Sequence, residues 1–98
     1  MDEAKTNRHV QEHADAVVRG DMEAVTNDFI EEMRAQVPEI GRALPMPVKS
    51  AEVLSLQVGD QESVAMIRYT GDSGQVTIRS RWRDVEGRPS IFAGEPVE

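Results

Sequence analysis

The sequence predicts an α+β domain in which helices come first and an antiparallel sheet follows. Before Pro47, apolar residues recur every three or four positions, as on the buried face of an amphipathic helix. After Pro47 they recur at about every second position, which is typical of strands. The chain has 98 residues, the length of one domain, so we expect a single domain over residues 1–98.

Three helices are expected in the first half of the chain. Thr6 or Asn7 is the expected cap of the first, which runs to about Arg19. Asp21 is a natural cap for the second, and Pro38 fits the first turn of a short third helix. The apolar faces comprise Val10, Ala14, Val17 and Val18 in the first helix and Met22, Val25, Phe29 and Met33 in the second.

Four strands are expected in the second half, over about Val48–Val58, Glu62–Thr70, Gln75–Val85 and Arg88–Ala93. In the first of them, Leu54, Leu56 and Val58 should share one face. The turns between the strands are short and contain glycine, which favours an antiparallel meander. We therefore expect the N-terminal helices to pack on the concave face of a bent antiparallel meander.

Composition and charge exclude several functions. The formal net charge of −7 disfavours nucleic-acid binding, and the absence of cysteine excludes disulfides, thiolate zinc sites and cysteine nucleophiles. No apolar stretch is long enough to cross a membrane, and the first twenty residues lack the apolar segment of a secretory signal. We expect a cytoplasmic protein with no cofactor and no membrane contact.

Several motifs in the chain, taken in order, resemble a known superfamily. They are the helix joint Gly20-Asp21-Met22-Glu23-Ala24-Val25, the apolar Phe29, Trp82, the Gly87-Arg88-Pro89 turn and the closing run Ile91-Phe92-Ala93-Gly94-Glu95-Pro96. Together they resemble the nuclear transport factor 2-like superfamily, in its polyketide-cyclase-like (SnoaL-like) branch. The resemblance implies a cystatin-like cone with a pocket between helices and sheet. It also implies frequent dimerisation and functions that range from isomerases, dehydratases and cyclases to non-catalytic modules.

Two departures from that pattern limit what the resemblance implies. The segment from Val37 to Pro47 leaves no room for the additional strands of typical members, so the chain would be a shortened member with a smaller pocket. No set of residues here matches a catalytic set of the family, so no catalytic residue is assigned.

His9, Glu12 and His13 form the pattern H-x-x-E-H, which is formally a zinc-protease motif. On a helix, however, Glu12 points away from the apolar stripe toward solvent, while His13 lies at the edge of the stripe. We therefore expect no metal site. His13 alone is a candidate for the mouth of a pocket, because histidine titrates near neutral pH.

The other pocket candidates lie on the inward faces of the expected elements. They are Phe29, Leu56, Ser80 and Trp82. Ser80 is the one clear polar side chain among the inward sheet positions, and aromatic residues in so small a chain are mainly core material. A small apolar ligand is the expected occupant of such a pocket.

Four arginines, Arg68, Arg79, Arg81 and Arg83, lie on the outer face of the expected sheet. One interpretation is a solvated face on which Glu52, Glu62 and Glu95 of neighbouring strands pair with them. The other is a dimer interface, where arginine is enriched. The acidic run Asp28, Glu31 and Glu32 is expected to be a solvated helix face.

Two hypotheses about function follow. The favoured one is a non-catalytic domain that dimerises through its sheet and binds a small apolar ligand or a partner protein. The alternative is a small-molecule isomerase, dehydratase or cyclase that uses His13 or a pocket carboxylate as a base. The inward positions are nearly all apolar, which favours the first; a cavity that contains His13 and a buried carboxylate would favour the second.

Overall fold

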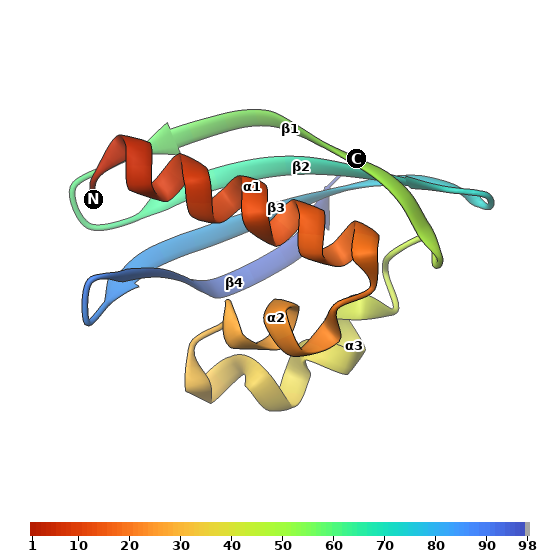
Figure 1. Cartoon of the computed structure of the whole chain (residues 1–98), viewed down its shortest axis with the longest axis horizontal. Helices are drawn as coiled ribbons and strands as arrows, with labels where there is room; N and C mark the ends of the chain where they lie inside the picture. Colours follow the sequence, from red (N-terminus) through yellow and green to blue (C-terminus); the bar gives the residue numbers. More distant parts are fainter. Residues whose placement is uncertain (98) are drawn as a thin grey trace.

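The computed structural model describes residues 1–97 and is α+β, with an N-terminal helix packed on a four-stranded antiparallel sheet (Figure 1). The helical elements are α1 (Glu3–Arg19), α2 (Met22–Asn27), the 3-10 helix η1 (Glu31–Gln36) and α3 (Val37–Gly41). The strands are β1 (Val48–Val58), β2 (Ser63–Gly71), β3 (Gly74–Val85) and β4 (Arg88–Val97). They lie in the order β1-β2-β3-β4, so the expected meander is present.

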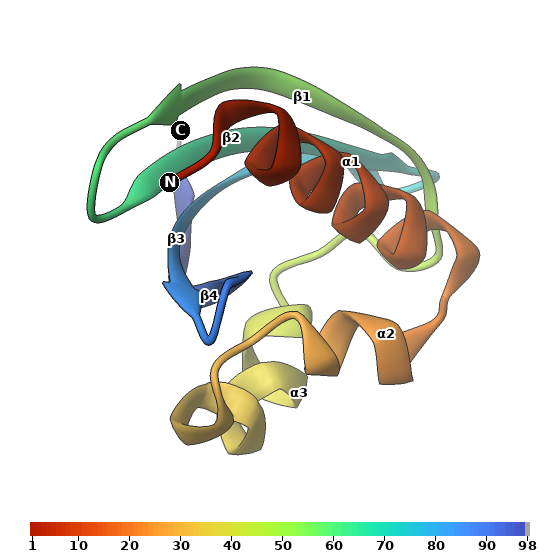
Figure 2. The ribbon, with the colours of Figure 1, turned by 60° about the vertical axis from the view of Figure 1, so that its left-hand side comes forward.

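The sheet curves around α1, whereas α2 and α3 lie beyond the end of α1 (Figure 2). As expected, α1 packs on the sheet. The other helical elements, α2, η1 and α3, pack mainly on α1 and on one another. The core between α1 and the sheet includes Val10, Ala14, Val17, Ile67 and Trp82. No helix within residues 1–97 combines the length and apolar character that a membrane span requires.

Helix α1 begins earlier than expected. The side chain of Asp2 accepts a hydrogen bond from the Lys5 N–H at 2.7 Å, so Asp2 and not Thr6 or Asn7 is the cap. Thr6 instead lies within the first turns of α1 and is fully buried. At the other end Gly20 takes a left-handed conformation with φ 74°, which glycine adopts readily, and stops the helix as expected.

Helix α2 is capped by Asp21, as expected, but ends at Asn27 instead of continuing to Met33. The chain leaves the helix there to bond with the backbone of Ile91 in β4. The Ile91 N–H donates to the Asp28 carbonyl at 2.7 Å, and the Ile30 N–H donates to the Ile91 carbonyl at 2.9 Å. These long-range backbone bonds hold Asp28 in a defined position next to the sheet.

Strand β1 contains a bulge that the alternation of its sequence does not reveal. Val53 pairs with Ile67 and Ser55 pairs with Met66, so Leu54 is the extra residue. Leu54 is consequently 45% exposed, and Val53 and Leu56 pack against the core. The expectation that Leu54, Leu56 and Val58 share a face is therefore wrong for Leu54.

Candidate functional site

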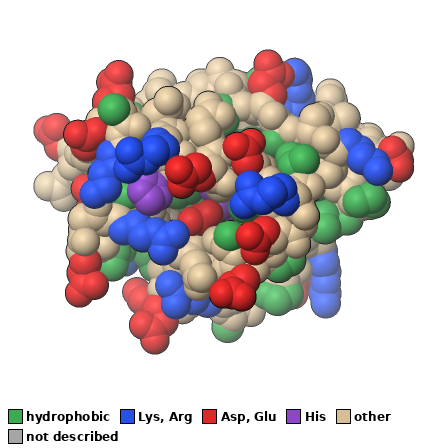
Figure 3. Space-filling view, viewed as in Figure 1, with side chains coloured by type: hydrophobic (Ala, Val, Ile, Leu, Met, Phe, Trp, Pro, Cys, Tyr) green, Lys and Arg blue, Asp and Glu red, His purple; other side chains and the backbone are tan. Residues whose placement is uncertain are grey.

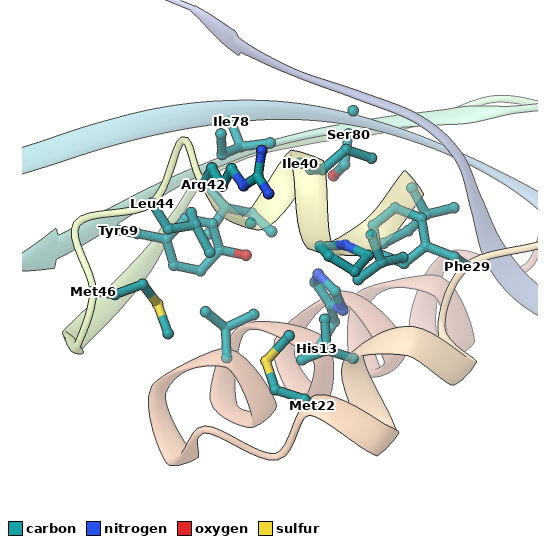
Figure 4. Close-up of a pocket in the computed structure, with 18 residues that line it drawn as sticks. His13, Met22, Phe29, Ile40, Arg42, Leu44, Met46, Tyr69, Ile78 and Ser80 are labelled. Carbon is teal, nitrogen blue, oxygen red and sulfur yellow. The ribbon is translucent and has the colours of Figure 1, made fainter. Parts of the chain in front are cut away.

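A cavity of about 390 Å³ lies between the helices and the inner face of the sheet (Figure 4). Helices α1, α2 and α3 and strands β2, β3 and β4 all contribute to it. Most of its wall is aliphatic or aromatic, with side chains that include Val17, Val25, Phe29, Val37, Ile40, Leu44, Ile67, Ile78 and Ile91. Such a wall favours an apolar occupant, because the burial of apolar surface is the main favourable contribution to the free energy of binding.

His13 of α1 lines the cavity and is paired with a buried carboxylate. Its Nδ1 lies 2.8 Å from Oδ2 of Asp28, and both residues are buried. A carboxylate accepts from an N–H, so this contact places the proton of the neutral ring on Nδ1 and leaves Nε2 unprotonated. Nε2 is then the nitrogen available to a molecule in the cavity.

Asp28, which does not line the cavity, is itself held by three interactions. Its Oδ1 accepts from the guanidinium of Arg88 at 2.8 Å, its side chain bonds to His13, and its backbone bonds to Ile91 as described above. Arg88, which is half-exposed, balances the carboxylate charge. These contacts fix the position of the carboxylate, which in turn orients the imidazole of His13.

Two aromatic rings pack on the imidazole from other directions. The Trp82 ring lies edge-on to His13 at 5.5 Å between centroids, and the Phe29 ring at 6.1 Å. The indole N–H of Trp82 donates to Ser80 Oγ at 2.9 Å, and Ser80 Oγ donates to the Ala65 carbonyl at 3.4 Å. These contacts leave His13 little freedom to rotate and keep the Ser80 hydroxyl occupied.

Tyr69 of β2 is the second polar group that faces the cavity. Its side chain is 3% exposed, and its hydroxyl points into the same space as the His13 ring (Figure 4). Burial, and to a smaller extent the charge of Asp28, raise the pKa of Tyr69 well above its ordinary value. The phenol therefore stays protonated at neutral pH.

The mouth of the cavity is lined by flexible side chains. Met22 and Met46 are 45% and 54% exposed, although both contact the cavity. Arg42 also borders it, but its side chain is mostly exposed and lies 3.6 Å from Glu39. Methionine side chains adapt to ligands of different shape, so the mouth can admit molecules of different outline.

Three of the five expected pocket residues, His13, Phe29 and Ser80, line the cavity. Trp82 does not; it is fully buried behind His13 and Ser80. Leu56 does not either, because it packs against the core on β1, away from the cavity wall.

Asp28 and Tyr69 are the residues that sequence reasoning missed. Asp28 was expected on a solvated helix face with Glu31 and Glu32, and this is wrong because the helix ends before it. A signal was present: Asp28 directly precedes Phe29 and lies beside the apolar stripe. Tyr69 was assigned to the core, and only the tertiary structure shows that its hydroxyl reaches a cavity.

The H-x-x-E-H pattern does not form a site. His13 is buried against Asp28, whereas Glu12 is exposed. Across residues 1–97 no group of three histidine or acidic side chains is arranged to hold a metal ion. The side chains of this motif therefore separate between core and surface.

The four outer arginines each pair with a glutamate of the same chain. The pairs are Arg68–Glu52, Arg79–Glu95, Arg81–Glu62 and Arg83–Glu32. Arg81 makes a two-pronged contact, with its Nε and terminal nitrogen 2.9 and 3.0 Å from the two oxygens of Glu62. The guanidinium groups of Arg81 and Arg83 also lie over the ring of Phe92, at 4.9 and 5.4 Å from its centroid. The expected cross-strand pairing with Glu52, Glu62 and Glu95 is thus present.

Acidic and basic side chains also intersperse on the face that carries α1 (Figure 3). On this face the mixing differs from the extended basic surface that binds phosphate backbones.

No protein-family model and no curated protein matches the chain. Its fold is similar to the solution structure of a SEC-C motif-containing protein from Rhodopseudomonas palustris, with a TM-score of 0.60 and 18% sequence identity. The similarity covers 85% of this chain and 71% of that one. At this identity the likeness shows the fold and carries no function.

This comparison overturns the resemblance expected from the sequence. The similar structure is a SEC-C motif protein and not a nuclear transport factor 2-like or SnoaL-like one, so that assignment is wrong. The reason is that Gly-Asp helix joints and Gly-Arg-Pro turns indicate only where a helix ends or a strand turns, and many folds share such motifs. The comparison supports the α+β arrangement of helix and sheet, but it does not confirm a cystatin-like cone.

Proposed function

We propose that the chain binds a small, mainly apolar molecule in the cavity and that His13, oriented by Asp28, exchanges a proton with it. The observation that carries this proposal is the 2.8 Å contact between His13 Nδ1 and Asp28 Oδ2 at the wall of an otherwise apolar cavity. The sequence alone favoured a non-catalytic domain. The contact of a cavity histidine with a buried carboxylate behind it instead favours acid–base chemistry.

The size and character of the cavity support binding of a small molecule. Its volume of about 390 Å³ falls in the range of ligand pockets, and its wall is apolar with a few convergent polar groups. The flexible Met22 and Met46 border the mouth and can adjust to an entering molecule.

The His13–Asp28 pair supports proton transfer. In the transfer, the lone pair of Nε2 takes a proton from a carbon next to a carbonyl, so an N–H bond forms and the C–H bond breaks. The electron pair of the C–H bond forms the C=C bond of an enolate, and the π pair of the carbonyl moves to its oxygen. The resulting imidazolium is stabilised by the Asp28 carboxylate, to which Nδ1–H remains bonded. Return of the proton to another atom of the substrate would complete an isomerisation.

Binding can be tested with a bicyclic ketone, 1-tetralone, as the probe. On titration into the isotope-labelled protein, we expect chemical-shift changes in backbone amides of cavity residues such as Val25, Ile67 and Ile78. Amides on the outer sheet face, such as that of Arg81, should not move. Uniform small shifts across the chain would show non-specific contact and contradict a cavity site.

Proton transfer can be tested with the same ketone in D₂O. We expect the protein to accelerate deuterium exchange at the carbon next to the carbonyl, and His13→Gln to return the rate to that of buffer. His9→Gln is the matched control, because His9 belongs to the same helix and does not line the cavity. Exchange that persists in His13→Gln would show that His13 is not the base.

We also propose that the chain dimerises through the outer sheet face. Support comes from the mixed rows of arginine and glutamate there, which would complement a second copy in a twofold arrangement. Arg81→Glu places two acidic side chains opposite each other at Glu62. We expect this variant to lower the mass measured by light scattering, whereas an unchanged dimeric mass, or a monomeric wild type, would contradict the interface.

The shape of the fold and the cellular location of the protein are also proposals. We propose a shortened cone, because the sheet curves around α1 and the cavity lies between sheet and helices (Figure 2). The cytoplasm is the proposed location on the basis of the acidic, cysteine-free composition.

A further inference from the structure

The hydroxyl of Tyr69 is a donor that opens into the cavity and has no protein partner among the described residues. It belongs to a side chain that is 3% exposed, it points into the cavity, and no hydrogen bond joins it to another group within residues 1–97 (Figure 4). A ligand that fills the cavity would cover this hydroxyl, and a covered polar group without a hydrogen bond is costly because it loses its bonds to water without replacement. The open position next to this hydroxyl is therefore suited to an acceptor atom.

The other polar groups of the cavity are already engaged on the protein side. The Ser80 hydroxyl accepts from Trp82 and donates to Ala65, and His13 Nδ1 is bonded to Asp28. What faces a ligand is thus one donor, the Tyr69 O–H, and one acceptor, His13 Nε2. A hydrocarbon would satisfy neither of them.

We infer that the molecule bound in the cavity is a neutral carbonyl compound with an apolar body, whose oxygen accepts a hydrogen bond from Tyr69. This inference rests on the proposed function and names its substrate class. A carbonyl oxygen bonded to Tyr69 would place the neighbouring C–H groups beside His13, on the same side of the cavity. The same bond would stabilise the negative charge that develops on the oxygen when His13 removes a proton.

The charges around the cavity favour a neutral ligand over a carboxylate. Asp28 already places a negative charge behind His13, and its effect reaches Tyr69. Among the described residues that line the cavity, the only lysine or arginine is Arg42, which is exposed and close to Glu39. A buried carboxylate would therefore lose its hydration without gaining a buried cation.

The test compares three probes of similar shape: tetralin, 1-tetralone and 1,2,3,4-tetrahydro-1-naphthoate. Their affinities are measured by backbone-amide shifts for the wild type and for Tyr69→Phe. We expect the ketone to bind the wild type about tenfold more tightly than tetralin, as for one net hydrogen bond. In Tyr69→Phe this preference should fall to about twofold or less while the affinity for tetralin stays unchanged.

A second measurement does not depend on the variant. The carbonyl of 1-tetralone labelled with ¹³C should absorb at a lower infrared frequency when bound to the wild type than in an aprotic apolar solvent. An unshifted carbonyl band would overturn the inference even if Tyr69→Phe did not fold.

The outcomes separate this inference from the function on which it rests. If tetralin and 1-tetralone bind the wild type equally, or if the carboxylate binds more tightly than the ketone, the inference is overturned and a cavity that binds small molecules still stands. If none of the three probes binds the wild type, the proposed function fails and the inference fails with it. Loss of the ketone preference in Tyr69→Phe, with tetralin binding intact, would support both.

Discussion

His13 and Asp28, 15 residues apart in the sequence, meet through a 2.8 Å contact between the middle of α1 and the residue that ends α2. The contact exists because α2 stops at Asn27 and its next residues bond to Ile91 in β4. Asp28 itself keeps a helical conformation as the C-cap of α2, and its carbonyl accepts from the Ile91 N–H where the chain leaves the helix. The end of α2 and its pairing with β4 thus bring together the two side chains of the candidate site.

Asp28→Asn should lower stability, because the neutral amide cannot pair with Arg88 as a carboxylate does and offers one acceptor in place of two. We expect a loss of roughly 1–3 kcal/mol in the free energy of unfolding, as for a hydrogen-bonded charged group that is largely buried. Urea denaturation at neutral pH measures it. Asp15→Asn is the control, since Asp15 is exposed on α1 and should change stability by no more than about 0.5 kcal/mol. Equal stability of the two variants would contradict the structural role of Asp28.

Tyr69 should resist ionisation in the folded protein. Burial and the charge of Asp28 raise its pKa above the ordinary value of 10.0, so the folded chain keeps the phenolic proton while the unfolded chain loses it. The corresponding stability is present below pH 10 and decreases as the pH rises past it. Because Tyr69 is the only tyrosine, absorbance at the phenolate band reports it directly. A transition at pH 10 that appears only in denaturant is expected, and the same transition in the native protein would contradict the buried position.

The bulge in β1 predicts different effects for two neighbouring residues. Val53→Ala removes two methyl groups that pack against the core and should lower the free energy of unfolding by about 1–2 kcal/mol. Leu54→Ala, at a position that is 45% exposed, should lower it by about 0.5 kcal/mol or less. Thermal or urea unfolding of both variants checks the register. The reverse order would mean that β1 alternates without a bulge.

Arg81 should hold the carboxyl of Glu62 in its charged form. Their hydrogen bond, more than the charge attraction, places the pKa of Glu62 below its ordinary value of 4.5. Because the folded pKa is lowered, the contribution of this pair to stability is present above pH 4.5 and lost as the pH falls through the folded value. Carbon NMR of the Glu62 carboxyl should show the pKa rising toward 4.5 in Arg81→Gln, whereas Arg68→Gln, which removes the partner of Glu52, should leave it in place. An unchanged value in Arg81→Gln would mean that the pair does not persist in solution.

Local patterns predicted most of the secondary structure. The change of period after Pro47, the Asp21 cap, the Gly20 stop and the glycine-containing turns all report interactions between residues close in sequence, and the corresponding elements are present. The strand starts and the meander order follow from the same signals. Even the pairing of the outer arginines was predictable, because alternate residues of neighbouring strands share a face.

The incorrect expectations concern interactions between distant residues. The end of α2, the exposure of Leu54 and the burial of Asp28 depend on Ile91, on the bulge opposite Ile67 and on His13, none of which is near in sequence. The superfamily resemblance failed for a related reason, since it relied on short turn motifs that fit several architectures.

By itself, the sequence determined that helices precede an antiparallel sheet and that His13, Phe29 and Ser80 face the interior, because helical and strand periods assign each side chain to a face. Only the tertiary structure decided that a cavity remains between helices and sheet, that Asp28 reaches His13 from the end of α2, and that the Tyr69 hydroxyl opens into that space. The periodicity of apolar residues specifies the direction in which each side chain points from its own helix or strand. Distances between elements depend on how their side chains pack and on long-range backbone bonds, which no local pattern contains.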